Sequence, residues 1–265
     1  MHILICENSI DGIFSGIYHA YEKRYGHKNT QLSTIEGVDT YQLFCEYEDI
    51  TTDAAISQKV ANTLISRLGT EVYSELCQAI SAYESPNERK KHINKAEAIY
   101  KTVVLGLSIP NGSHILEYLG NPYVNRVFQL SLSTFNEAHH MLGFLRFSEL
   151  ENGILFSRIH PKNYILPLLA DHFTDRLPQE NFIIYDEPRK IAAVHKSGSR
   201  YMLAEVPQAD ENFINQFSDK EQEYRTLWLT FFHSIAIEAR KNPKLQSQNL
   251  PKRFWQDTIE LSGNS

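Results

Sequence analysis

Cysteine is scarce in this chain, and the placement of its cysteines excludes several kinds of site. Only three of the 265 residues are cysteine, and Cys6, Cys45 and Cys77 lie far apart. They have neither the CxxC spacing of zinc and redox sites nor the even number of a disulfide framework. The three-cysteine spacing of an iron–sulfur ligand set is also missing. We therefore predict no metal and no cofactor, and isolated cysteines of this kind suit the reducing cytoplasm.

Long apolar runs and an excess of positive charge are missing as well. No stretch approaches the length that crosses a membrane, and the first residues are too short and too polar-flanked for a signal peptide. We expect a soluble, cytoplasmic protein. Its formal net charge of -6 means that a site for nucleic acid would have to be a local basic patch on an acidic body.

The first half of the chain reads as a strand followed mainly by helices. The apolar run over 2–6 predicts a buried strand, and Ser9 suits the N-cap of a helix that continues to about Tyr25. The turn between them has no run of glycines, so we favour a packed strand–helix unit over a phosphate-binding loop. A strand is predicted over 40–48, and helices over 53–83 with a break at Gly69, over 93–108 and over 123–149.

The second half changes to short strands joined by tight turns. These turns are short enough for antiparallel hairpins, and the whole pattern predicts an α+β fold. In that fold a helix-rich N-terminal half packs with a compact, mostly antiparallel β-sheet. We predict strands over 154–159, 182–186, 190–196 and 201–206, and helices over 164–176 and about 220–240. We predict a single elaborated domain over 1–265, with a helical part at about 50–150, a β-rich part at about 151–206, and a C-terminal helix and basic tail at about 220–265.

Histidines and arginines interrupt the apolar pattern of residues 135–176. His139 and Arg146 are seven residues apart, so they are predicted to share one helix face and to be buried against the sheet. His160 stands in a turn between a strand and a helix. Histidine can transfer a proton and arginine suits anions, so His139, His160 and Arg146 are candidate catalytic residues. The alternative is a hydrogen-bonded network that only fixes the fold.

The turn His160-Pro161-Lys162-Asn163 has a superficial likeness to the His-Pro motif of uracil-DNA glycosylases, whose histidine stabilises charge on an expelled base. Those enzymes also need an acidic, glycine-rich motif early in the chain, and nothing here matches it. The tetrapeptide is therefore interpreted first as the start of a helix.

The most basic stretch of the chain is its C-terminal tail. Between Glu238 and Trp255 it has five basic residues and one acid. Cations contact phosphates, and an aromatic ring can stack on a base. The alternative is that Phe254 and Trp255 are buried and anchor the tail. The candidate nucleic-acid-binding residues are Lys162, Arg240, Lys244, Lys252, Arg253 and Trp255.

Five motifs along the chain resemble an uncharacterised bacterial family of DNA metabolism and DNA repair proteins. They are ENSIDGIFSGIYHAY (7–21), NPYVNRV (121–127), EAHHMLGFLRFSELENGILF (137–156), PLLADHFTDRLPQENFIIYDEPRKIAAVH (167–195) and NPKLQSQNLPKRFW (242–255). The resemblance implies a domain of unknown function whose members are encoded beside a radical-SAM DNA modification or repair protein. Some relatives are fused ahead of a uracil-DNA glycosylase-like domain. At Glu7-Asn8 the chain departs from the Asp-Gly pair of the family, which weakens the case for a ligand at the first turn.

Three hypotheses follow for function. The leading one is an accessory protein of DNA metabolism that acts with a radical-SAM partner and binds either that partner or nucleic acid, such as single-stranded or damaged DNA. The second is an enzyme that acts on a nucleobase or a nucleic-acid lesion, with His139 or His160 transferring the proton and Arg146 holding an anion. The third is a purely structural adaptor whose histidines are all satisfied in the core.

Overall fold

The computed structural model describes residues 1–37, 43–207, 216–235, 237, 240 and 242–258. The chain divides into two compact units, Met1–Asn136 and Glu137–Ser265. The single domain expected over 1–265 stays a prediction. None of the helices in these described ranges combines the length and the apolar character needed to cross a membrane.

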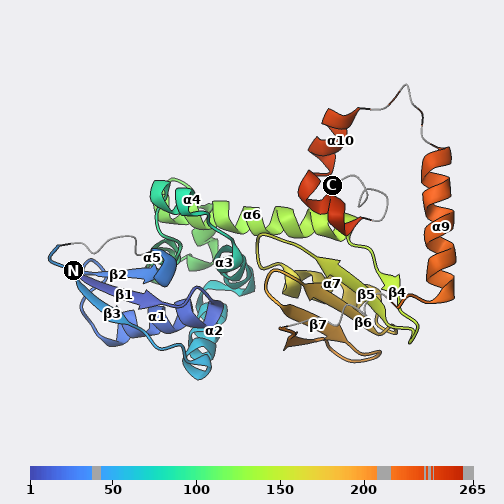
Figure 1. Cartoon of the computed structure of the whole chain (residues 1–265). Helices are drawn as coiled ribbons and strands as arrows, with labels where there is room; N and C mark the ends of the chain where they lie inside the picture. The colour runs from blue at the N-terminus through green and yellow to red at the C-terminus, as the bar shows by residue number, and fades with distance from the viewer. Residues whose placement is uncertain (38–42, 208–215, 236, 238–239, 241, 259–265) are drawn as a thin grey trace. The chain divides into compact units, whose positions relative to one another are not determined.

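The first unit is built on a small parallel sheet. Its strands are β1 (His2–Cys6), β2 (Thr30–Thr34) and β3 (Glu46–Asp49), in the order β2-β1-β3 (Figure 1). The strand predicted over 2–6 is confirmed, and the one predicted over 40–48 begins only at Glu46, with 40–42 outside the described residues. The strand β2 was not predicted, because its residues TQLST lack an apolar run.

Helices make up the rest of the first unit. The predicted division at Gly69 is confirmed: Gly69 has a φ of +96°, which ends one helix and begins the next. The helices are α1 (Ile10–Glu22), α2 (Ala54–Leu68), α3 (Thr70–Ser81), α4 (Pro86–Lys91), α5 (Lys95–Ser108) and α6 (Pro122–Phe144), whose last turns belong to the second unit. Short 3₁₀ segments lie at Ile35–Gly37 and Gly112–Glu117.

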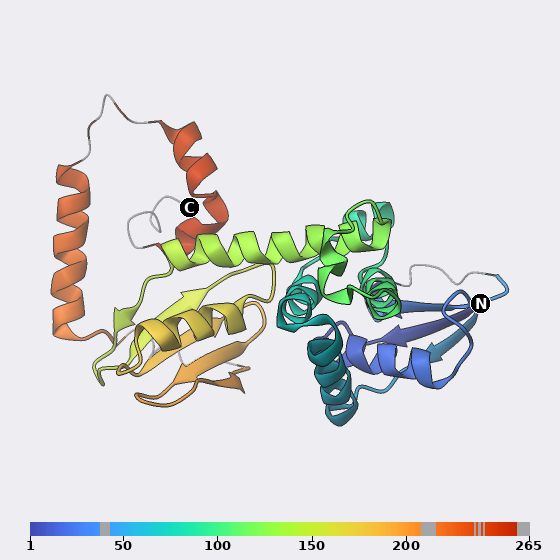
Figure 2. The ribbon, with the colours of Figure 1, turned by 180° about the vertical axis from the view of Figure 1, so that it is seen from behind.

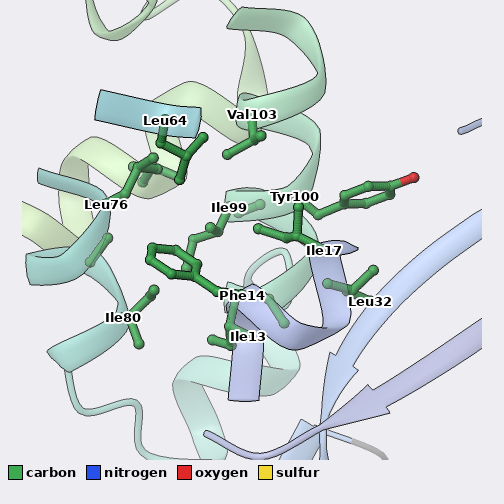
Figure 3. Packing of buried hydrophobic residues seen from close by; sticks show 14 of the residues in the cluster. Ile13, Phe14, Ile17, Leu32, Leu64, Leu76, Ile80, Ile99, Tyr100 and Val103 are labelled. Atoms are coloured by element: carbon green, nitrogen blue, oxygen red, sulfur yellow. The ribbon is translucent and has the colours of Figure 1, made fainter. Parts of the chain in front are cut away.

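One apolar core holds this unit together. The side chains of Phe14 on α1, Leu64 on α2, Leu76 on α3 and Ile99 on α5 point into a common interior and are fully buried or nearly so (Figure 3). Each has a buried apolar neighbour three or four positions further along its helix, as in an apolar stripe; these neighbours are Ile17, Leu68, Ile80 and Val103. The apolar residues from which the sequence predicts these helices are therefore the same residues that form the core.

Polar groups are also buried in the first unit, and two of them, Glu84 and Lys95, have well-defined partners. Glu84 forms an ion pair with Arg126 on α6. The ammonium of Lys95 donates to the carbonyl oxygens of Ile80 (2.8 Å) and Ala82 (2.7 Å), at the end of α3. These contacts satisfy helix-end carbonyls that have no partner within the helix.

The second unit contains a mixed sheet of five strands in the order β4-β5-β6-β7-β8. The pair β5–β6 is parallel and the other three pairs are antiparallel, which confirms the mostly antiparallel sheet. The parallel pair is connected through α7 (Leu166–Arg176), and Figure 2 shows this helix lying over one face of the sheet. The strands are β4 (Ser148–Glu149), β5 (Leu155–Ile159), β6 (Phe182–Asp186), β7 (Ile191–His195) and β8 (Met202–Glu205).

The predicted end of the long helix at 149 is wrong, because α6 stops at Phe144. Ser148 and Glu149 instead pair with Phe156 and Leu155 across a turn in which Gly153 has a φ of +77°. This hairpin uses backbone groups that a longer helix would have needed. The remaining elements are α9 (Asp219–Ser234), α10 (Pro243–Asn249) and a 3₁₀ segment, η4 (Lys252–Asp257), so the last long helix ends before the predicted 240.

Candidate functional site

The turn formed by residues 160–163 (HPKN turn) is fixed by a buried acid. The carboxylate of Glu137, on α6, accepts hydrogen bonds from the backbone N–H groups of Lys162 (3.1 Å) and Asn163 (2.7 Å). Glu137 is only 3% exposed. Nothing in the sequence indicated that Glu137 reaches a turn 25 residues further on.

His160 is paired with an acid from the next strand. Its Nε2 lies 2.7 Å from Oε2 of Glu187. His160 follows β5, Glu187 follows β6, and the ends of these strands are aligned because Ile159 is in register with Asp186. The carboxyl ends of parallel strands are a common place for ligand sites. The parallel pairing of β5 and β6 therefore brings an imidazole and a carboxylate together.

Cations surround this pair. Arg158 Nη1 lies 3.4 Å from Oε2 of Glu187, and Lys190 Nζ lies 4.0 Å from Oε1. Burial by itself would raise the pKa of Glu187. The hydrogen bond from His160 and the charges of Arg158 and Lys190 outweigh burial and hold the pKa below its ordinary value. Glu187 is therefore an ionised partner for His160 at neutral pH.

A second acid at the same edge has a structural role. Asp186 is fully buried and pairs with Arg189, whose Nη1 lies 3.1 Å from Oδ2. Burial raises the pKa of Asp186, and the charge of Arg189 opposes that shift. Arg189 also donates to the carbonyl oxygens of Pro161 and Lys162. The guanidinium thus ties the HPKN turn to the hairpin between β6 and β7.

The predicted buried pair of His139 and Arg146 is wrong, since both side chains are exposed. Because α6 ends at Phe144, Arg146 lies beyond the helix, and the seven-residue helical spacing no longer relates it to His139. The guanidinium of Arg146 donates to the carbonyls of Gly143 (3.0 Å) and Leu145 (3.2 Å) and caps the helix end. The ring of His139 lies beside that of His140, with 6.5 Å between the ring centroids.

The C-terminal tail is anchored by one of its two aromatic residues. Phe254 is fully buried, and its ring centroid lies 5.8 Å from that of Phe144 on α6. Trp255 is partly exposed, and its indole N–H donates to the carbonyl of Leu250 (3.0 Å). The ammonium of Lys252 lies 5.7 Å from the Trp255 ring centroid. The anchor that the sequence offered as an alternative is therefore confirmed for Phe254.

The other candidate nucleic-acid-binding residues are solvent-exposed where the structure describes their side chains. They are Lys162, Arg240, Lys244 and Lys252; the side chain of Arg253 lies outside the described residues.

In the described part of the chain, no group of three or more histidine, cysteine, aspartate or glutamate residues is placed to hold a metal ion.

A cavity of about 260 Å³ opens in the first unit between α1, α2 and α5. No sequence motif indicated it. Its lining contains no carboxylate and no histidine. It is lined by Ile17, Tyr18, Tyr21, Lys59, Val60, Thr63, Leu64, Val103 and Leu107.

Comparison with known families places most of this chain in one of them. The profile described as domain of unknown function DUF4130 matches residues 93–260, which is more than half of the chain. The chain belongs to the DUF4130 family. The DUF4130 region extends from the start of α5 past η4, so it includes the HPKN turn, the His160–Glu187 pair and the basic tail.

No curated protein matches the chain. Among solved structures, the chain is similar to one described as the DHH domain of a member of the s1p family of ribosomal proteins. The two are 11% identical, the match covers 74% of this chain and 73% of the other, and the TM-score is 0.29. At that TM-score the likeness supports no functional inference about the DUF4130 region.

Proposed function

We propose that this DUF4130 protein is an accessory protein of DNA metabolism or repair that binds nucleic acid and acts with a radical-SAM partner. The resemblance of its five motifs supports the association with DNA repair and with the partner. The exposed cations Lys162 and Lys252, which belong to two segments held against the last turns of α6, support the binding of nucleic acid.

The main support for this proposal is that two separate groups of candidate residues, the HPKN turn and the C-terminal tail, are held by one face of α6. Glu137 binds the backbone of Lys162, and Phe144 packs against Phe254, next to Trp255. Glu137 and Phe144 are seven residues apart, so they share a helix face and are separated by about 10 Å along the axis. Both segments are therefore held against the same two turns of α6, where Lys162 and the tail would contact phosphates of one strand.

Binding to single-stranded DNA is expected to weaken steeply as salt rises. Each phosphate contact on a single strand contributes about 0.7 to the slope of log affinity against log salt. The variant Lys162→Ala/Lys252→Ala should therefore bind less tightly and have a slope smaller by roughly 1.4. Fluorescence anisotropy titrations of a labelled oligonucleotide at several salt concentrations measure both quantities.

The matched control is Lys28→Ala/Lys59→Ala, which removes two exposed lysines from the first unit and has the same net charge. It should bind as the wild type does. Trp255→Ala should lower affinity with almost no change in slope, because stacking releases no counterions. If the test variant had the same affinity and slope as the wild type and the control, Lys162 and Lys252 would not belong to a nucleic-acid site.

The partner is tested separately, by co-purification with the neighbouring radical-SAM protein in the presence and absence of DNA. Co-elution of the two proteins is the expected result. If they elute apart under both conditions, the partnership fails, and the DNA titrations still decide the binding of nucleic acid.

A second candidate function is an enzyme that acts on a nucleobase or a nucleic-acid lesion. The 2.7 Å contact between His160 and Glu187 favours it, because a carboxylate that orients a histidine is the usual arrangement for acid–base catalysis. Here Glu187 would act through His160, as a positioning residue.

This candidate predicts that damaged oligonucleotides are altered by the wild type and not by His160→Gln. Glu187→Gln should keep part of the activity, because the amide oxygen can still accept a hydrogen bond from the His160 ring. Separation of the products on denaturing gels would detect the reaction. If the wild type alters none of the oligonucleotides, the enzyme candidate is abandoned and the structural adaptor gains support.

A further inference from the structure

The helix α9 is attached to the second unit through its charged side chains. Arg225 Nη2 donates to Ser148 Oγ (2.8 Å), and Glu221 Oε2 accepts from the backbone N–H of Glu149 (3.3 Å), so both contacts reach β4. The guanidinium of Arg225 also lies 3.8 Å from the ring centroid of Phe217 and binds Glu221 at 2.9 Å. Figure 1 shows α9 standing beside the β4 end of the sheet.

Another side of the same helix is apolar and exposed. Tyr224, Leu227, Trp228 and Phe231 are between 42% and 67% exposed (the α9 stripe). Their spacing of three, one and three residues forms a single stripe along the helix. Amphipathic helices normally direct such a stripe into the core, whereas α9 uses charged groups for attachment and leaves its stripe in solvent. Contiguous exposed apolar surface of this kind marks an interaction site, and aromatic residues supply most interface anchors.

The spacing of the stripe matches a second copy of the same helix. Its four positions are symmetric about a point midway between Leu227 and Trp228. A two-fold axis at that point, with the second helix antiparallel, places Tyr224 opposite Phe231 and Leu227 opposite Trp228. Each contact then occurs twice, as an isologous interface requires.

The charges of α9 favour the antiparallel arrangement over the parallel one. Every Asp, Glu, Lys and Arg of α9 lies between Asp219 and Arg225, and residues 226–234 have none of these types. An antiparallel copy places the charged half of one helix beside the uncharged half of the other. A parallel copy would place Glu223 beside its own equivalent, and facing like charges are destabilising.

We propose that the α9 stripe is the interface of an antiparallel homodimer of this chain. The inference is independent of the proposed binding of nucleic acid, because it uses none of the residues assigned to that face. A dimer would have two copies of the proposed nucleic-acid-binding surface formed by Lys162 and the C-terminal tail. This increases the effective affinity for a strand long enough to contact both copies.

Sedimentation of the full chain over a range of concentrations tests the proposal. The wild type should form dimers. Leu227→Glu should be monomeric at concentrations where the wild type is dimeric, with an unchanged circular dichroism spectrum. The control Thr226→Glu introduces the same charge on the polar side of α9 and should leave the dimer intact.

The register is tested by complementary charges. Tyr224→Lys alone and Phe231→Glu alone should each weaken self-association by roughly tenfold or more, the effect of losing an aromatic anchor. An equimolar mixture should associate more tightly than either alone, because the antiparallel register pairs the introduced lysine of one chain with the introduced glutamate of the other. In a parallel register the two introduced charges would not face each other, so the mixture would associate no more tightly than its components.

Three results would overturn the proposal. They are a wild type that stays monomeric at every concentration, a dimer that Leu227→Glu does not affect, and a mixture that is no tighter than its components. If a monomeric wild type lost a different protein partner on substitution of the stripe, that partner would be the occupant and the homodimer would be rejected.

Discussion

Replacing Glu84 by alanine is expected to lower the free energy of unfolding of the first unit by about 3–5 kcal/mol. Glu84 pairs with Arg126, and their side chains are only 7% and 10% exposed. The Nε of Arg126 is already buried without a hydrogen-bond partner among the described residues. Loss of the carboxylate would leave an uncompensated buried guanidinium, which costs more than the pair contributes. Urea denaturation of the wild type and the variant measures the difference.

The double variant Glu84→Leu/Arg126→Met is the control for this experiment. Replacing a buried ion pair by apolar side chains of similar volume is often close to neutral, so the double variant should recover most of the lost stability. A single variant as stable as the wild type would show that water reaches the guanidinium and that the pair is not buried in solution.

The second large effect is a pH dependence due to Lys95. Burial lowers the pKa of this ammonium to about 8, and the carboxylates of Glu84 and Glu36 limit the shift. The ordinary pKa is about 10.4, so between these values the unfolded chain holds a proton that the folded chain has released. Stability due to this group therefore rises with pH across that window, by about 3 kcal/mol in total.

The variant Lys95→Met isolates this effect, because it has no proton to lose at that position. Its stability relative to the wild type should fall as the pH increases from 8 to 10.5. Burial raises the thiol pKa values of Cys6 to about 12 and of Cys77 to about 11, so the stability of both proteins decreases above pH 9. That decrease is common to both and cancels in the difference. Two parallel curves would mean that Lys95 keeps its ordinary pKa in the folded state.

Several elements were predictable because their signals are local. The apolar runs of β1, β6 and β7 and the helix break at Gly69 depend on residues close together in the chain. The HPKN turn between β5 and α7 was predictable for the same reason, because proline and asparagine are turn residues. Membership of an uncharacterised family also followed from short motifs, and the match over residues 93–260 supports it.

Only the tertiary structure decided which of the candidate residues are brought together. The carboxylate of Glu187 meets His160 from 27 positions away because β5 and β6 pair in parallel, and no local pattern encodes that pairing. Glu137 is buried under the HPKN turn, and β2 is a strand although its composition is polar.

The sequence by itself therefore determined the α+β class, most of the helices and the basic character of the tail, since these depend on periodicity and composition. It could not determine that α6 ends at Phe144, which removes Arg146 from the helix face of His139. That end depends on the hairpin of β4 with β5. Pairing between strands depends on the positions of distant backbone groups, and only the folded chain specifies them.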